Sequence, residues 1–390
     1  MELPDYHGGS IVNLMRSIER AFDARPCEGA LAYPELQALP AQALAGARNV
    51  VLLVLDGLGY DYLVDAGAGS ALKRLLKARL TSVFPSTTAT AVTSFLTGVG
   101  PQQHALTGWT AWLRELGSVA ATLRFRPRHG GESYAKSGVA ARSLYTAESM
   151  FDRLAAKSYV VSPENIINSD YNLAHCGVAD RRPYQDLPAL FSTLTEIVRS
   201  GSERKFIHAY TYDLDAAAHT YGSASPELQT TFRQIDAAFA HLLEELKGSD
   251  TLVIAVADHG FTDSPRARCI ELADHPQLVE TLVLPLCGER RVVYCYVHPG
   301  REQAFEHYVQ TRLAHCADLY RSADLIAQSW FGLGPAHPRL AERVGDYTLV
   351  MKDDYTIKDW LLGEQHHLTL GVHGGVSAAE MHVPLILAAA

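Results

Sequence analysis

Residues 49–57, Asn-Val-Val-Leu-Leu-Val-Leu-Asp-Gly, decide the fold expected for this chain. The run from Asn49 to Leu55 is almost wholly apolar and leads directly into Asp56 and Gly57. Strands that are buried on both faces have this continuous pattern, which is typical of parallel sheets covered by helices. We therefore predict a buried strand over residues 49–55 that ends at a carboxylate.

Three further apolar runs have the same character, at residues 205–212, 251–257 and 383–387. An amphipathic helix is predicted between the runs at 205–212 and 251–257, because Ser225 and Pro226 form a start signal and apolar residues then recur every three or four positions. Strands that alternate with such helices indicate an α/β fold with a mostly parallel central sheet and helices on both faces.

The chain of 390 residues is long enough for one large domain with insertions. We predict a single domain over residues 1–390. The segment of about residues 270–343 mixes a strand pattern, a helix and a turn region, and is predicted to form a small inserted α+β lobe.

Charge and composition narrow the classes of partner. The formal net charge is −9, and no sustained stripe of basic residues offsets it, which argues against binding to a nucleic-acid polymer. No apolar run is long enough to suggest a membrane span, and the six cysteines include no Cys-x-x-Cys pair. These features favour a cytoplasmic protein without a disulfide framework.

Acidic residues follow three of the predicted strands: Asp56, the pair Asp213 and Asp215, and Asp258. Ligands of open α/β sheets bind at the carboxyl ends of the strands, so these side chains could converge although they are distant in sequence. A single acid after a strand is more often part of a turn or a helix cap. Only a combination of such residues indicates chemistry.

Histidines accompany two of these acids. In Asp258-His259-Gly260, a carboxylate and an imidazole could reach one metal ion if the chain turns sharply at the glycine. In Asp215-Ala-Ala-Ala-His219, a spacing of four places both side chains on one face of a helix. His373 lies before two glycines near the C-terminus. Each motif alone also fits a structural role: a turn, a helix-supporting pair or a packed histidine.

Hydroxyl groups cluster where a helix is predicted to begin. Within Thr81 to Gly98, the Phe84-Pro85 pair ends an extended stretch and Ser86-Thr87-Thr88 opens a helix to about Leu96. Such a hydroxyl is usually an N-cap. The free N–H groups and the positive end of the helix dipole also suit phosphate oxygens, and a hydroxyl beside a metal ion could act as a nucleophile.

Taken in order, these elements resemble the alkaline phosphatase superfamily, and in particular the type I phosphodiesterase/nucleotide pyrophosphatase family, from about Asn49 to Pro384. The resemblance implies that one metal is held by Asp215, His219 and His373. It implies that the other is held by Asp56, Asp258 and His259, with Thr88 bound to it as the nucleophile. Thr88 is selected by its distance from Pro85, with Ser86, Thr87 and Thr90 as rivals.

The implied function is a hydrolase with two divalent metal ions, zinc or alternatively manganese or iron, that forms a phospho-threonine intermediate. Its substrates would be small phosphate or phosphonate diesters or nucleotide pyrophosphates. The alternatives are a phosphomonoesterase, a phosphonate hydrolase or a phosphomutase-like enzyme, and a metal-binding module without catalysis.

Trp109 stands where diesterases of the family carry an asparagine. The basic stretch Arg124 to His129 is either a site for an anionic substrate tail or a solvated loop.

Overall fold

The computed structural model describes residues 1–364 and 366–390. A seven-stranded central sheet consists of β1 (Asn49–Leu55), β2 (Leu76–Thr81), β6 (Lys157–Pro163), β7 (Asp180–Tyr184), β8 (Lys205–Thr211), β9 (Thr251–Val256) and β18 (His382–Ala389). Their order is β2-β18-β9-β1-β8-β6-β7. β1 pairs in parallel with both β8 and β9, whereas β18 is antiparallel to its neighbours. The predicted strands and the mostly parallel sheet are confirmed.

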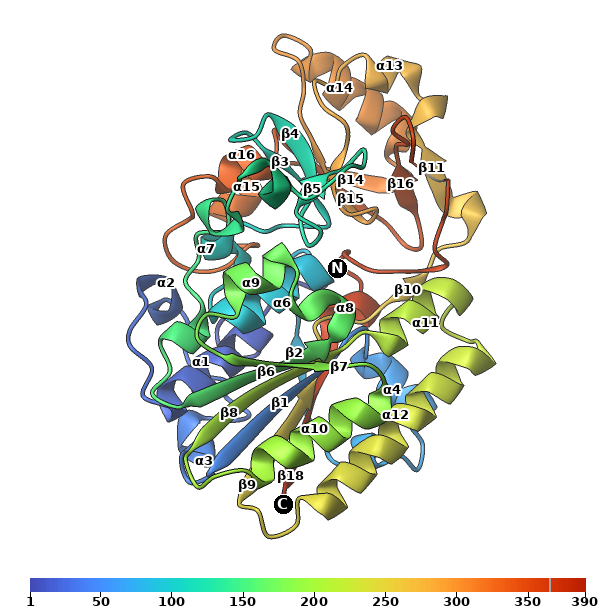
Figure 1. The fold of residues 1–390 in the computed structure, drawn as a ribbon. Helices are drawn as coiled ribbons and strands as arrows, with labels where there is room; N and C mark the ends of the chain where they lie inside the picture. Colours follow the sequence, from blue (N-terminus) through green and yellow to red (C-terminus); the bar gives the residue numbers. More distant parts are fainter. Residues whose placement is uncertain (365) are drawn as a thin grey trace.

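Helices cover both faces of this sheet (Figure 1). The longer ones are α1 (Ile11–Ala21), α4 (Tyr60–Ala66), α6 (Thr88–Thr97), α9 (Asp170–His175), α10 (Leu187–Arg199), α11 (Asp213–Tyr221) and α12 (Pro226–Glu245). The predicted start of α12 is confirmed, because the Leu228 N–H donates to the Ser225 hydroxyl at 3.1 Å. Its apolar stripe, including Phe232 and Phe239, is buried in the main core.

A second, antiparallel sheet of seven strands lies above the first in Figure 1. Its strands are β3 (Thr110–Leu113), β4 (Ser118–Ala121), β5 (Arg126–Pro127), β12 (Cys287–Gly288), β13 (Val292–Cys295), β14 (Ala317–Arg321) and β15 (Tyr347–Met351). We call this sheet the lobe, together with α13 (Pro276–Val279), α14 (Glu302–Tyr308), α15 (Ser322–Ala327) and α16 (Leu340–Arg343). The segment predicted as a lobe, about 270–343, covers β12, β13 and β14, whereas β3–β5 and β15 lie outside it.

A buried ion pair joins the lobe to the body. Arg291 donates to both carboxylate oxygens of Glu380, at 3.0 and 2.9 Å, and both side chains are almost fully buried. Glu380 also accepts the Gly375 N–H at 2.8 Å, next to His373 and Gly374. The lobe therefore supports the loop that carries His373. Among the described residues, no helix is long and apolar enough to cross a membrane.

Candidate metal centre and nucleophile

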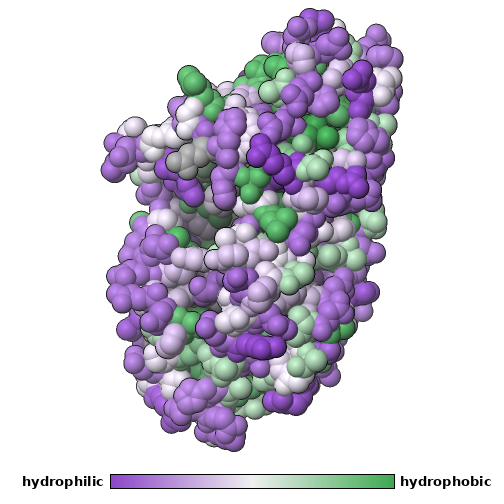
Figure 2. Space-filling model, turned by 90° about the vertical axis from the view of Figure 1, so that its right-hand side faces the viewer, coloured by the Kyte–Doolittle hydropathy of each residue, from purple (hydrophilic) through white to green (hydrophobic). Residues whose placement is uncertain are grey.

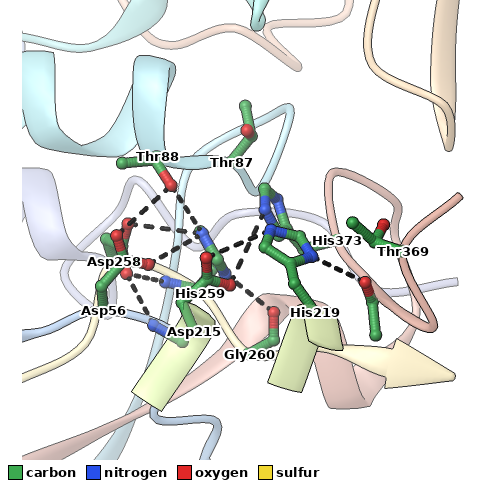
Figure 3. Close-up of polar contacts among 12 residues, drawn as sticks. Asp56, Thr87, Thr88, Asp215, His219, Asp258, His259, Gly260, Thr369 and His373 are labelled. Atoms are coloured by element: carbon green, nitrogen blue, oxygen red, sulfur yellow. Dashed lines mark hydrogen bonds and ion pairs between the residues drawn. The ribbon is translucent and has the colours of Figure 1, made fainter. Parts of the chain in front are cut away.

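Six predicted ligands converge at the carboxyl edge of the central sheet (Figure 3). Asp56 follows β1, Asp258 and His259 follow β9, Asp215 and His219 lie on α11 after β8, and His373 follows β17 (Gly371–Val372). Asp213 does not join them: it accepts the Thr211 hydroxyl at 2.6 Å where α11 begins. The parallel order of β8, β1 and β9 thus brings together residues about 200 positions apart, and the loop after β17 adds His373, more than 300 positions from Asp56.

The site contains two groups of three residues that could each hold a metal ion. Within each group, the possible ligand atoms all lie within 4.8 Å of one another. One group is Asp56, Asp258 and His259, the set expected for one cation. The other is Asp215, His259 and His373, so His259 belongs to both groups. The predicted His219 lies beside the second group, with its Nε2 atom 3.1 Å from Asp215. The His259 ring stacks on His373 at a centroid distance of 3.8 Å.

Backbone carbonyls orient two of the imidazoles. His259 Nδ1 lies 2.9 Å from the Gly260 carbonyl oxygen, and His219 Nδ1 lies 2.7 Å from that of Gly371. An N–H at Nδ1 would donate to the carbonyl and leave Nε2 as an acceptor facing the carboxylates. Metal-binding histidines are commonly held in this way.

Gly260 was expected to permit a sharp turn, but the structure shows another reason for a glycine at this position. A Cβ atom there would lie 2.0 Å from the Ala379 carbonyl oxygen, so the glycine permits a close approach of two backbones. The Gly260 N–H also donates to the Glu380 carbonyl at 2.9 Å. The segment that carries Asp258 and His259 is therefore pressed against the segment that leads into β18.

The three carboxylates lie close enough to perturb one another. Burial, and then Asp258 and Asp215, raise the pKa of Asp56 well above its usual value. Burial, followed by the charge of Asp215, raises the pKa of Asp258 to about 7. For Asp215 burial acts in the same direction, but the hydrogen bond from His219 and the charges of His219, His373 and His259 together outweigh it and lower the pKa. Without a counter-ion, the pocket holds more negative charge than its surroundings stabilise.

Several residues of the ligand groups have a polar atom with no hydrogen-bond partner within the described chain. These atoms are Oδ1 of Asp56, Oδ1 of Asp215, Oδ2 of Asp258 and Nδ1 of His373, all buried. A buried polar atom without a hydrogen bond is costly, and divalent cations would satisfy these atoms and neutralise the carboxylates. Imidazole and carboxylate without thiolate suit zinc and also accommodate manganese or iron. The residues present therefore fit a metal centre.

Thr88 is the hydroxyl that faces this cluster. Its Oγ1 lies 3.1 Å from His259 Nε2 and 3.5 Å from Asp56 Oδ2 (Figure 3). The rival hydroxyls have other surroundings: Ser86 donates to the Gly375 carbonyl at 2.8 Å, Thr87 donates to Glu289 at 2.7 Å, and Thr90 is buried without a partner in the described chain. The geometry thus distinguishes Thr88 from hydroxyls that the spacing alone left open.

Two residues at the site were not predicted from the sequence. The buried Tyr210, on β8, donates its hydroxyl to Asp56 Oδ2. Glu289, from the lobe, accepts the Thr87 hydroxyl and, at 2.6 Å, the Trp109 N–H. Burial raises the pKa of Glu289 to about 7. Tyr210 could have been suspected from its place near the end of an apolar strand, whereas nothing in the spacing marks Glu289.

A parallel sheet whose carboxyl edge joins three carboxylates, three imidazoles and a helix-start hydroxyl defines a hydrolase of the alkaline phosphatase superfamily. More narrowly, the chain belongs to the type I phosphodiesterase/nucleotide pyrophosphatase family, whose model matches residues 50–375. This family is metal-dependent, and the Asp/His groups described above are able to bind metal.

Solved structures share the fold at low sequence identity. Murine ectonucleotide pyrophosphatase/phosphodiesterase 5 superposes with a TM-score of 0.63 at 16% identity, covering 86% of this chain and 87% of that one. Phosphonoacetate hydrolase from Sinorhizobium meliloti 1021, in complex with phosphonoformate, gives a TM-score of 0.62 at 18% identity, covering 88% and 90%. A search of curated protein sequences finds no match to the chain.

Proposed function

We propose that this protein holds two divalent cations, with zinc preferred, and cleaves small phosphate diesters or nucleotide pyrophosphate bonds with Thr88 as the nucleophile. The observation that carries the proposal is the position of the Thr88 hydroxyl, 3.1 Å from His259 Nε2 and beside buried ligand atoms that have no hydrogen-bond partner in the described part of the chain. Asp56, Asp258 and His259 would hold one cation, and Asp215, His219 and His373 the other.

The cations, the Thr88 hydroxyl and the start of α6 have separate roles in the proposed reaction. Bound cations would lower the pKa of a neighbouring hydroxyl and stabilise charge on the phosphoryl and leaving oxygens. The Thr88 oxygen forms a bond to phosphorus while the bond to the leaving oxygen breaks, which gives a phospho-threonine and a free alcohol or phosphate. Water then cleaves the new ester and restores Thr88. The free N–H groups at the start of α6 favour the anionic group.

A structure of a relative supports this role for a threonine. An inactive threonine-to-alanine variant of murine ectonucleotide pyrophosphatase/phosphodiesterase 5 has been solved in complex with AMP, at a TM-score of 0.63 and 17% identity to this chain. By extension, a nucleotide or another small phosphorylated molecule is the proposed substrate here.

A phosphomonoesterase or phosphonate hydrolase is the second candidate, and the surroundings of Trp109 favour it. Diesterases of the family are expected to carry an asparagine at this position, and Trp109 offers no side-chain amide. The backbone N–H of Trp109 is already donated to Glu289. The usual support for a non-bridging phosphate oxygen is thus absent from this residue. Rates with 4-nitrophenyl diesters and the matching monoester decide between the two candidates.

The decisive variant is Thr88→Ala, with Thr87→Ala as its matched control. Zinc-loaded Thr88→Ala should retain the wild-type zinc content by elemental analysis and lose about 10³-fold or more in kcat, since the nucleophile is absent. Thr87→Ala should retain much more activity. Full activity in Thr88→Ala refutes the nucleophile. A zinc-loaded wild type that cleaves no phosphate ester or pyrophosphate refutes the enzyme and leaves a metal-binding module.

A further inference from the structure

A pocket of about 600 Å³ opens beside the candidate metal centre. Its wall comes mainly from the lobe and from the segment that follows β16 (Thr356–Lys358), and includes Trp109, Arg124, Arg126, Glu289, Arg290 and Lys358. On the face shown in Figure 2, the surface is hollowed between the upper part of the molecule and the larger lower part. We call this cavity the basic pocket.

The charge of the basic pocket is opposite to that of the protein. Five guanidinium or ammonium groups line it against three carboxylates, whereas the formal net charge of the chain is −9. One of the five is structural: the Arg128 side chain is only 4% exposed and pairs with Asp359 at 2.6 Å and with Glu364 at 3.1 Å. Lys358 lies 3.5 Å from Glu364, so Arg128 and Lys358 together offset Asp359 and Glu364, and three arginines remain against Glu289.

Three arginines in the wall have no carboxylate partner among the described residues. Arg290 donates to the hydroxyls of Thr369 and Thr356 at 3.0 and 3.1 Å, and its buried Nε has no acceptor in the described chain. Arg124 lies over the Trp109 ring at 5.6 Å, and Arg126 lies in β5. Burial, and then the neighbouring Arg126, lower the pKa of Arg124. Such unpaired like charges favour an anion between them.

The basic pocket adjoins the segments that carry the proposed reaction site. Glu289 lines the pocket and also accepts the hydroxyl of Thr87, the neighbour of Thr88. On the other side, Thr369 lines the pocket, and the next residue, Leu370, donates its N–H to the His219 carbonyl at 2.9 Å. These contacts place the pocket next to the segments that carry Thr88 and His219.

We propose that the basic pocket binds a second anionic group of the substrate, a carboxylate or a phosphate, carried by the same molecule as the reacting phosphorus. This inference rests on the proposed function and specifies its substrate class. Arg124, Arg126 and Arg290 bind the second anion, and the exposed Trp109 ring contacts the linker. Residues 124–129 are therefore neither wholly a site for an anionic tail nor wholly a solvated loop, because Arg128 is a buried structural residue.

Calorimetric binding to the zinc-loaded protein tests this inference without turnover. The probes are ethylphosphonate, 2-carboxyethylphosphonate and ethane-1,2-diphosphonate, which share a phosphonate and differ in the group at the far end. Charge-assisted hydrogen bonds to arginine should make the two probes with an anionic tail bind roughly 10- to 100-fold tighter than ethylphosphonate. The relative affinity of the carboxylate and phosphonate probes shows which anion the pocket prefers.

The double variant Arg124→Gln/Arg126→Gln should lose most of this preference and keep the affinity for ethylphosphonate. Arg301→Gln, at an exposed arginine elsewhere in the lobe, is the matched control and should retain the preference. A wild type without the preference, or a folded double variant that keeps it, overturns the inference. If the double variant does not fold, raising the salt concentration must reduce the wild-type preference; an unchanged preference is equally contradictory.

These outcomes separate the two proposals. A protein that hydrolyses phosphate esters but binds all three probes equally contradicts the anionic-tail pocket alone. A protein that shows the preference but cleaves no ester contradicts the proposed function and leaves the anion site in place.

Discussion

Replacing Tyr210 with phenylalanine isolates the hydrogen bond that orients Asp56. The Tyr210 hydroxyl is buried and donates to Asp56 Oδ2, while Asp56 Oδ1 has no hydrogen-bond partner among the described residues. A hydrogen bond to a charged group contributes about 1.5–3 kcal/mol, which corresponds to roughly 10- to 100-fold in a binding constant. Removing residues that support metal ligands has effects of this size. We therefore expect Tyr210→Phe to weaken zinc binding at one site by this factor.

The assay is a zinc titration of the metal-free protein in competition with a chromophoric chelator. Tyr212→Phe is the matched control, because the Tyr212 hydroxyl lies near Asn165 at 3.1 Å and away from the cluster. The control should bind zinc as the wild type does. Wild-type zinc affinity at both sites in Tyr210→Phe would refute the argument that Tyr210 prepares Asp56 for a cation.

Three further predictions concern single groups and pH. Asp258→Asn should lose one equivalent of zinc and most activity; two equivalents by elemental analysis would contradict its assignment. For the metal-free protein, the raised pKa of Asp258, about 7, means that the folded state retains a proton that the unfolded state loses above about pH 4, so stability should fall as pH rises from about 4 to 7. The melting temperature in chelator should therefore be lower at pH 8 than at pH 5.5. A higher melting temperature at pH 8 would contradict this prediction. Arg291→Met should lower the free energy of unfolding by about 3–5 kcal/mol, because it leaves Glu380 buried without its partner; a loss below about 1 kcal/mol in urea unfolding would show that the pair is dispensable.

The body of the fold was predictable because its signals are local. The runs that became β1, β8 and β9 are apolar along almost their full length, since both faces of these strands are buried. The acids after them converge for a topological reason, namely that parallel neighbours end at the same edge. Thr88 required family spacing as well, because four hydroxyls share the start of α6 and only the folded chain shows which one faces the cluster.

The remainder depended on contacts between distant segments. β3, β4 and β5 are short, and β12, with which β3 pairs, begins at Cys287, so no local pattern shows that they share a sheet. Glu289 lies between two lobe strands in a charged stretch that resembles an ordinary turn. Its partners, Thr87 and the Trp109 N–H, are about 180–200 residues away, and their proximity is decided by packing of the lobe on the body.

Three successive lobe residues are anchored to different parts of the molecule: Glu289 to Thr87, Arg290 to Thr369 and Arg291 to Glu380. A hinged swing of the lobe would have to break all three attachments at once, including one salt link shielded from water. We therefore expect the lobe to be a fixed wall, with no open and closed states to gate the catalytic cycle. Substrate selection would then depend on a preformed shape, and a change of specificity requires only new side chains on that wall.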